Sequence, residues 1–79
     1  MSRVLVPLAR GFEEIEAVSI IDVLRRADIE VLVASLNEES GVKGANGITV
    51  MSDINIKDVA VDELDMIVLP GGVEGTYAL

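Results

Sequence analysis

Apolar residues along this chain gather in short blocks that are separated by polar connections and by one amphipathic stretch. Residues 3–8 (RVLVPL), 29–36 (IEVLVASL) and 66–69 (MIVL) are largely apolar and rich in β-branched side chains. Such runs are typical of strands that are covered on both faces, as in a parallel sheet. The stretch between the first two runs is long enough for a crossover helix.

The sequence predicts that this helix runs from about Glu13 or Glu14 to Ala27. Three glutamates lie in its first turn and two arginines in its last, which suits the helix dipole. Gly11 allows a sharp bend before the helix, and Asp28 separates it from the next strand. At about 100° per residue, one broad apolar arc faces the sheet. The arc consists of Ala17, Ile20, Ile21, Val23, Leu24 and Ala27.

From Gly41 onward the pattern changes to that of a hairpin. Residues 42–45 and 48–51 flank Asn46-Gly47, a strong hairpin signal because both residues accept positive φ. Residues 56–64 are predicted to contain a short helix. The strand at 66–69 stops before Pro70, which cannot continue a central ladder. Right-handed crossovers place the three apolar strands parallel in one sheet.

This set of elements is small for a parallel sheet, which needs helices on both faces. One full helix and one short helix leave an apolar face and a sheet edge exposed. We therefore expect residues 1–79 to be the N-terminal half of a single α/β domain. The remainder would be a C-terminal segment, a cleaved partner chain or another subunit.

Charge and composition remove several classes of function. The 14 acidic and 6 basic residues give a net charge of −8, which disfavours binding to nucleic acid or to an anionic membrane. No stretch approaches the roughly 20 apolar residues of a membrane helix, and a secretory signal is not expected. The chain has no Cys and no His, so it lacks disulfides, Cys metal sites and the usual general base. These features fit a cytoplasmic protein.

Glu16 is the acidic residue of the helix that calls for an explanation. It falls at the border of the apolar arc, between Val23 and Ala27, whereas Glu13 and Glu14 need no special role in a first turn. Partial desolvation there would favour a neutral carboxyl, which the helix N-terminus opposes. A neutral Glu16 could hydrogen-bond a nucleophile or act as an acid or base. Alternatively, it reaches solvent or caps backbone N–H groups, which is the commoner outcome.

Gly71 and Gly72 follow directly on the last strand, where ligands bind in open α/β sheets. They form an oxyanion hole, an anion nest or simply a tight turn. A phosphate loop is disfavoured because no Lys follows and Glu74 would repel phosphate. The acidic residues between positions 53 and 65 show no metal-ligand spacing. Ile15 and Val18 lie toward the polar side of the helix, either as ordinary exposed residues or as part of a subunit interface.

Three segments together resemble a known family. Residues 9–17 (ARGFEEIEA) resemble the A-x-G-x-E-E-x-E signature of the ThiJ/PfpI superfamily, in the branch of the parkinsonism-linked deglycase and a bacterial chaperone. Residues 21–27 (IDVLRRA) and 65–72 (DMIVLPGG) match that branch in order and spacing. The resemblance covers essentially the whole chain. It implies a flavodoxin-like α/β sandwich, related to class I glutamine amidotransferases, that is usually a homodimer and needs no cofactor.

By position, the resemblance implies that Glu16 is the protonated carboxyl that hydrogen-bonds the family's cysteine nucleophile. Gly72, with Gly71, would supply backbone N–H groups to the oxyanion hole, and the helix with Ile15 and Val18 would lie at the dimer interface. The cysteine itself, on a strand–helix elbow, and a nearby His lie beyond this chain. Close relatives often carry Arg at the position of Asn46, so one Arg-dependent contact across the dimer is not expected here.

The function implied for the intact protein is cysteine chemistry on small electrophiles such as glyoxals or their adducts, as a deglycase or glyoxalase. A stress-protective chaperone, an oxidation sensor and a peptidase-like role belong to the same family. One alternative is a non-catalytic fragment or split chain that functions only by assembly with its complementary half. Another is a class I amidotransferase relative, which the acidic helix motif disfavours. The expected partners are the C-terminal half and a second copy, with no nucleic acid and no membrane.

Overall fold

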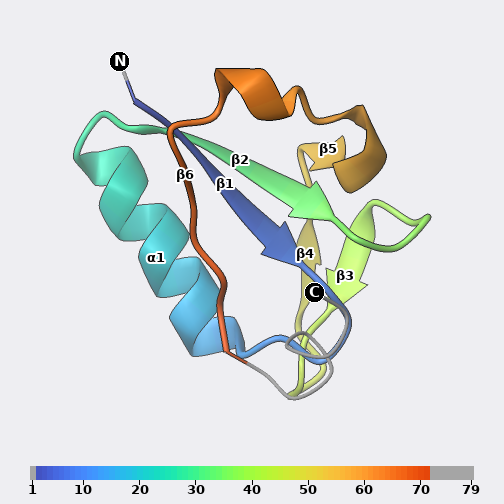
Figure 1. Ribbon diagram of the computed structural model, residues 1–79. Coiled ribbons are helices and arrows are strands. Elements are labelled where there is room, and N and C mark those ends of the chain that lie inside the picture. Colours follow the sequence, from blue (N-terminus) through green and yellow to red (C-terminus); the bar gives the residue numbers. More distant parts are fainter. Residues whose placement is uncertain (1, 72–79) are drawn as a thin grey trace.

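The computed structural model describes residues 2–71, which form a parallel sheet, one α-helix and a small hairpin (Figure 1). Two 3-10 turns, Ile56–Asp58 and Val61–Glu63, precede the last strand. The helix and strands are β1 (Arg3–Leu8), α1 (Glu14–Arg26), β2 (Glu30–Ser35), β3 (Gly41–Lys43), β4 (Thr49–Met51), β5 (Ile54–Asn55) and β6 (Met66–Ile67).

The sheet has the strand order β5-β2-β1-β6, and every neighbouring pair is parallel. β1 and β2 pair along their whole length, from Arg3 opposite Glu30 to Leu8 opposite Ser35. The predicted parallel arrangement of the three apolar strands is therefore confirmed. β5 was not predicted, because it is only two residues long and, among the described residues, pairs only with the end of β2.

The core lies where α1 and the hairpin pack on β1 and β2. Its buried members are Val4, Val6, Leu8, Phe12, Ala17, Ile21, Val31, Val33 and Val42. Phe12 is fully buried, although the sequence pattern indicated only that it belongs to the turn out of β1. Within residues 2–71, no helix is long and apolar enough to cross a membrane.

β6 differs from its prediction. Met66 and Ile67 are 58% and 51% exposed, so the expectation of a strand covered on both faces is wrong for the described residues. Among these residues β6 pairs only with β1 and forms an edge of the sheet. The expected open edge is confirmed, whereas the expected exposed apolar face is not found, because no large apolar side chain of β1 or β2 is exposed among the described residues.

Several boundaries also differ from the sequence pattern. α1 ends at Arg26, and Asp28 breaks the chain direction in a left-handed conformation with φ 60°. The hairpin is confirmed, but residues 44–48 form a wider loop than the expected two-residue turn, and Gly47 alone of the Asn-Gly pair has positive φ. Residues 56–64 contain two 3-10 turns in place of the predicted short α-helix.

Ion pairs connect the strand ends. The Arg3 guanidinium binds Glu30 at 2.8 Å and Glu63 at 3.2 Å, while the Arg3 N–H donates to Asp65 at 2.7 Å. The hydrogen bond and the negative charge of Glu30 raise the pKa of Arg3. This cluster fixes the approach to β6 at the amino end of the sheet.

Candidate functional site at the first turn of α1

The first turn of α1 is held at the carboxyl end of β1 by the connection that precedes it. Gly11 has φ 90°, and its N–H donates to the Lys43 carbonyl of β3 at 2.9 Å. The Phe12 N–H returns to the Ala9 carbonyl at 3.1 Å, and its ring enters the core. The start of the helix therefore lies at the edge where parallel sheets bind ligands.

Glu16 and Gly71 meet at this edge. The Gly71 N–H donates to Glu16 Oε1 at 3.1 Å, across 55 positions of sequence, and the Gly71 carbonyl accepts from the Glu13 N–H at 2.8 Å. A Cβ at position 71 would lie 2.8 Å from Glu16 Oε2, so a larger residue would displace the carboxylate. The structure thus brings together two of the residues that the sequence selected.

The surroundings of Glu16 differ from the prediction in one respect. Its side chain is exposed, so the expected partial desolvation is wrong for the described residues. The reason is that the buried face of α1 is centred closer to Ala17 and Ile21 than the predicted apolar arc was. Val23, at the far border of that arc, is therefore 62% exposed. The Gly71 N–H is already used by Glu16, and the predicted second donor, Gly72, lies outside the described residues.

Glu14 is the functional candidate that the sequence pattern missed. It is only 4% exposed, and its carboxylate accepts hydrogen bonds from the Asn46 N–H (2.7 Å), Asn46 Nδ2 (3.0 Å) and the Ile48 N–H (3.2 Å). Burial favours the neutral acid, but the hydrogen bonds from the backbone and from Asn46 outweigh it, so the pKa of Glu14 is lowered. Glu14 therefore remains an anion, and its hydrogen bonds fix the conformation of the hairpin loop.

Gly44 is part of the same arrangement. A Cβ at position 44 would lie 2.5 Å from Glu14 Cδ, so the carboxyl group occupies the space that any other residue would need. The Ala45 N–H closes the loop onto the Phe12 carbonyl at 2.9 Å. A usable signal existed: on the helical wheel Glu14 falls only about 20° from Ile21, at the opposite border of the arc from Glu16.

The two residues predicted at an interface are exposed, Ile15 at 82% and Val18 at 47%. Val18 borders a groove of about 240 Å³ between α1 and β4. Ile15 does not border it. The groove is lined by Val18, Ile21, Asp22, Arg25, Val33, Val50, Met51 and Asp53.

The described site is rich in acids and backbone groups. The chain contains neither Cys nor His, and no group of three or more potential metal ligands occurs within residues 2–71. Glu16 Oε2 has no hydrogen-bond donor among these residues. The arrangement can therefore orient a carboxyl group beside a glycine turn, while a cysteine nucleophile is not among the residues of this chain.

The parallel sheet with its crossover helix is that of a flavodoxin-like α/β protein, as in the solved DJ-1 structures that the chain resembles. More specifically, the DJ-1/PfpI family matches over residues 2–79, and the chain belongs to this family. The family resemblance predicted from the three sequence segments is confirmed.

Individual relatives agree with this assignment. Protein dj-1beta of Drosophila melanogaster is 45% identical over 75 residues, which cover 95% of this chain and 40% of that protein. Its crystal structure superposes with a TM-score of 0.91 at 46% identity, covering 99% and 42% of the two chains. DJ-1 homolog B of Arabidopsis thaliana is 44% identical over 77 residues, covering 98% and 18%. A deglycase of Thermococcus kodakarensis is 37% identical over 70 residues, covering 89% and 42%. The chain thus spans less than half the length of each relative.

Proposed function

We propose that this chain is the part of a DJ-1/PfpI protein that poises a reactive cysteine supplied from outside these 79 residues. The observation that supports the proposal best is the contact between Glu16 and Gly71 at the carboxyl edge of the sheet. The Gly71 N–H fixes one carboxyl oxygen and leaves Oε2 for a second partner. A protonated carboxyl that donates to a thiolate stabilises it and lowers the pKa of the thiol.

The activity that we propose for the intact protein is that of a deglycase or glyoxalase. The thiolate would attack the carbonyl carbon of a glyoxal or its adduct, and the electron pair of the C=O bond would move onto oxygen. The backbone N–H group of Gly72 would stabilise that oxyanion. The identity with a protein named as a deglycase supports this choice. The same poised thiol would serve an oxidation sensor, and we place the protein in the cytoplasm.

A second candidate is a split chain that functions by assembly with its complementary half. The exposed side chains of the edge strand and the residues after it favour this candidate, because Met66, Ile67 and Leu69 are each more than half exposed. Such an apolar edge is a template for further pairing. The complementary half would cover this edge, and the assembly would function without thiol chemistry.

The thiol proposal predicts a specific effect of Glu16. In the natural protein that contains this chain, Glu16→Ala should raise the cysteine pKa by about 1–2 units, since a hydrogen bond to a charged group contributes about 1.5–3 kcal/mol. Labelling by iodoacetamide below that pKa should slow by about tenfold or more. Glu16→Gln keeps a donor and should shift the pH profile less.

The control is Asp22→Asn, an exposed acid on the same helix whose carboxylate pairs only with Arg26 among the described residues. It should leave the labelling profile unchanged. If Glu16→Ala showed the same pH profile of labelling as the wild type, the proposal that Glu16 lowers the pKa of the cysteine would be contradicted. An intact denatured mass that shows no cysteine-bearing segment in the protein or its assembly would favour the non-catalytic alternative.

We also propose that the protein forms a homodimer through α1. The side chains that support this interface are exposed and apolar, with Ile15 at the first turn and Val18 on the groove beside Met51. The flanking Arg25 and Asp53 pair with each other at 3.0 Å, which gives the apolar groove a charged rim.

For this interface, Val18→Glu should raise the dimer dissociation constant at least tenfold, because dimer formation would bury an unpaired charge. Sedimentation equilibrium over a range of protein concentrations measures the constant. The matched control is Val61→Glu, since Val61 is also exposed but lies on a 3-10 turn that does not line the groove. Equal effects of both variants, or a monomeric wild type, would contradict the interface.

A further inference from the structure

The basic residues of this acidic chain are distributed unevenly. Of the six, Arg3, Arg25 and Arg26 form ion pairs with acids of the chain. For Arg10, Lys43 and Lys57, residues 2–71 provide no ion-pair partner. Arg10 and Lys43 border the same hollow, although they lie on different segments. With these two cations against one acid, Glu13, the lining of the hollow carries a net positive charge in a chain whose net charge is −8.

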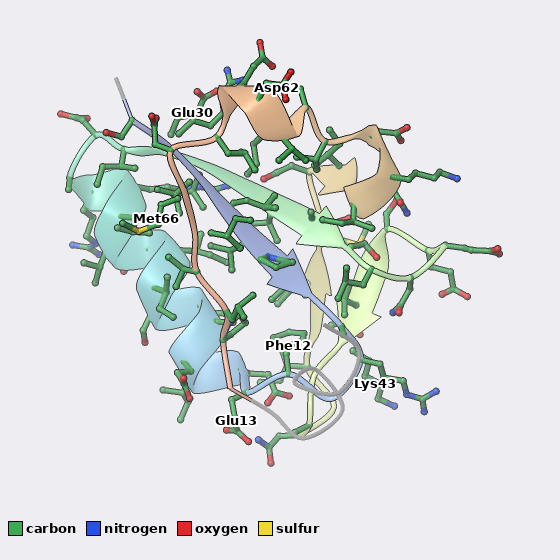
Figure 2. All side chains as sticks on the ribbon, in the orientation of Figure 1. Phe12, Glu13, Glu30, Lys43, Asp62 and Met66 are labelled. Atoms are coloured by element: carbon green, nitrogen blue, oxygen red, sulfur yellow. The ribbon has the colours of Figure 1, made fainter. Side chains whose placement is uncertain are left out.

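The hollow lies between the β1–α1 connection and the hairpin loop, and its volume is about 590 Å³. This volume lies within the range of pockets that bind small molecules. Three of its lining residues are glycines, Gly11, Gly44 and Gly47, so much of its wall is bare backbone. Lys43 Cε lies 3.8 Å from the position that a Cβ on Gly47 would take, which places the lysine stem along the loop. Figure 2 shows Lys43 projecting outward from the hairpin.

The walls of the hollow are joined to each other by hydrogen bonds. The Gly11 N–H donates to the Lys43 carbonyl at 2.9 Å, and the Gly47 N–H donates to the Gly44 carbonyl at 3.1 Å. The buried Glu14 carboxylate holds the same loop from below through two backbone N–H groups. The N–H groups of all three lining glycines have backbone acceptors, so at these glycines a ligand would meet chiefly the charges of the side chains. The hollow is therefore formed before any ligand arrives, which reduces the entropic cost of binding.

We propose that this hollow binds the carboxylate of a small organic anion. The planar guanidinium of Arg10 suits bidentate binding of a carboxylate, and the Lys43 ammonium adds a point charge. Glu13 also lines the hollow and opposes a second negative charge, which favours a monoanion over a phosphate dianion. A neighbouring hollow shares both cations but adds Glu38 and Glu39, so it is less suited to an anion.

This site goes beyond the proposed thiol function, because binding at it requires no cysteine. A solution titration with acetate, followed by ¹⁵N amide shifts of the natural protein at constant ionic strength, tests it directly. The amides of Gly11, Gly44 and Gly47 should shift with saturation in the millimolar range. Arg10→Gln and Lys43→Gln should each weaken binding about three- to tenfold, since each removes one charge-assisted contact.

Three further variants separate a built site from general surface charge. Arg10→Lys keeps the charge but loses the bidentate geometry, so it should bind with intermediate affinity. Glu13→Gln should tighten acetate binding. Lys57→Gln removes a cation that also lacks an ion pair within residues 2–71 but does not line the hollow, and it should leave the titration unchanged.

Other outcomes would overturn the proposal. Non-saturating shifts, or equal weakening by Lys57→Gln and Lys43→Gln, would show only diffuse electrostatics. Tighter binding of inorganic phosphate than of acetate would contradict the carboxylate assignment. Because thiol labelling measures the cysteine separately, failure here leaves the thiol proposal intact, and the reverse also holds.

Discussion

Replacing Phe12 with alanine is expected to lower the free energy of unfolding by about 3–5 kcal/mol. Phe12 is the largest of the fully buried side chains among the described residues, and it is the one Phe of the chain. Its ring belongs to the core cluster, and its carbonyl accepts from the Ala45 N–H of the hairpin loop. The substitution therefore leaves a cavity where α1, β1 and the hairpin meet. Urea unfolding of the purified protein measures the change.

Two variants provide the scale for this result. Phe12→Leu keeps much of the apolar volume and should cost less than about 1.5 kcal/mol. Val61→Ala truncates an apolar side chain that is 68% exposed and should change stability by no more than about 0.5 kcal/mol. A loss below about 1 kcal/mol for Phe12→Ala would mean that the helix start does not depend on this ring.

The parts of the fold that local patterns specify were predictable. β1 and β2 are apolar over most of their length, and α1 has a periodic apolar arc with acids in its first turn and arginines in its last. The hairpin followed from Asn46-Gly47. β6 was located correctly, but its burial was not, because burial depends on which elements cover a strand rather than on its own residues.

The misses at the candidate site and in the hairpin depend on contacts between residues distant in sequence. Nothing within residues 9–13 indicates that the Phe12 ring turns into the core. The wide hairpin loop exists because a helix carboxylate more than thirty positions away takes two of its N–H groups. A wheel built from residue types alone placed the buried face too far toward Val23, so it selected Glu16 as the inward acid and overlooked Glu14.

At the candidate site, the family motif indicated that Glu16 and the glycine turn act together. The spacing of the residues alone did not show that the two are in contact. The sequence pattern indicated Glu16 and the glycine turn separately, and the structure adds their contact at 3.1 Å. The chemical role of that contact stays a prediction, because it concerns a cysteine outside the chain. Gly72, the other predicted donor, lies outside the described residues.

The pair formed by Glu14 and Gly44 gives the second large effect, a loss of stability that should not be additive. Gly44→Ala should lower Tm by on the order of 5–10 °C, because its Cβ would displace the carboxyl group from the loop N–H donors. Glu14→Ala should lower Tm by a similar amount. In the Glu14→Ala background the carboxyl group is gone, so Gly44→Ala should cost no more than about 2 °C. Additive losses in this double-mutant cycle would show that the close approach does not constrain the loop.

The contribution of Glu14 to the stability of the fold should depend on pH, and the direction of that dependence follows from its pKa. The pKa of Glu14 is lower in the folded protein than its ordinary value, so its carboxylate stabilises the fold above the unfolded pKa. That contribution is lost as the pH falls through the folded pKa. The Tm difference between wild type and Glu14→Gln should therefore stay constant near neutral pH and shrink below about pH 4.5. A difference that grows on acidification would mean that Glu14 holds the loop as a neutral acid, and the loop would then depend on an O–H donor rather than on a buried anion.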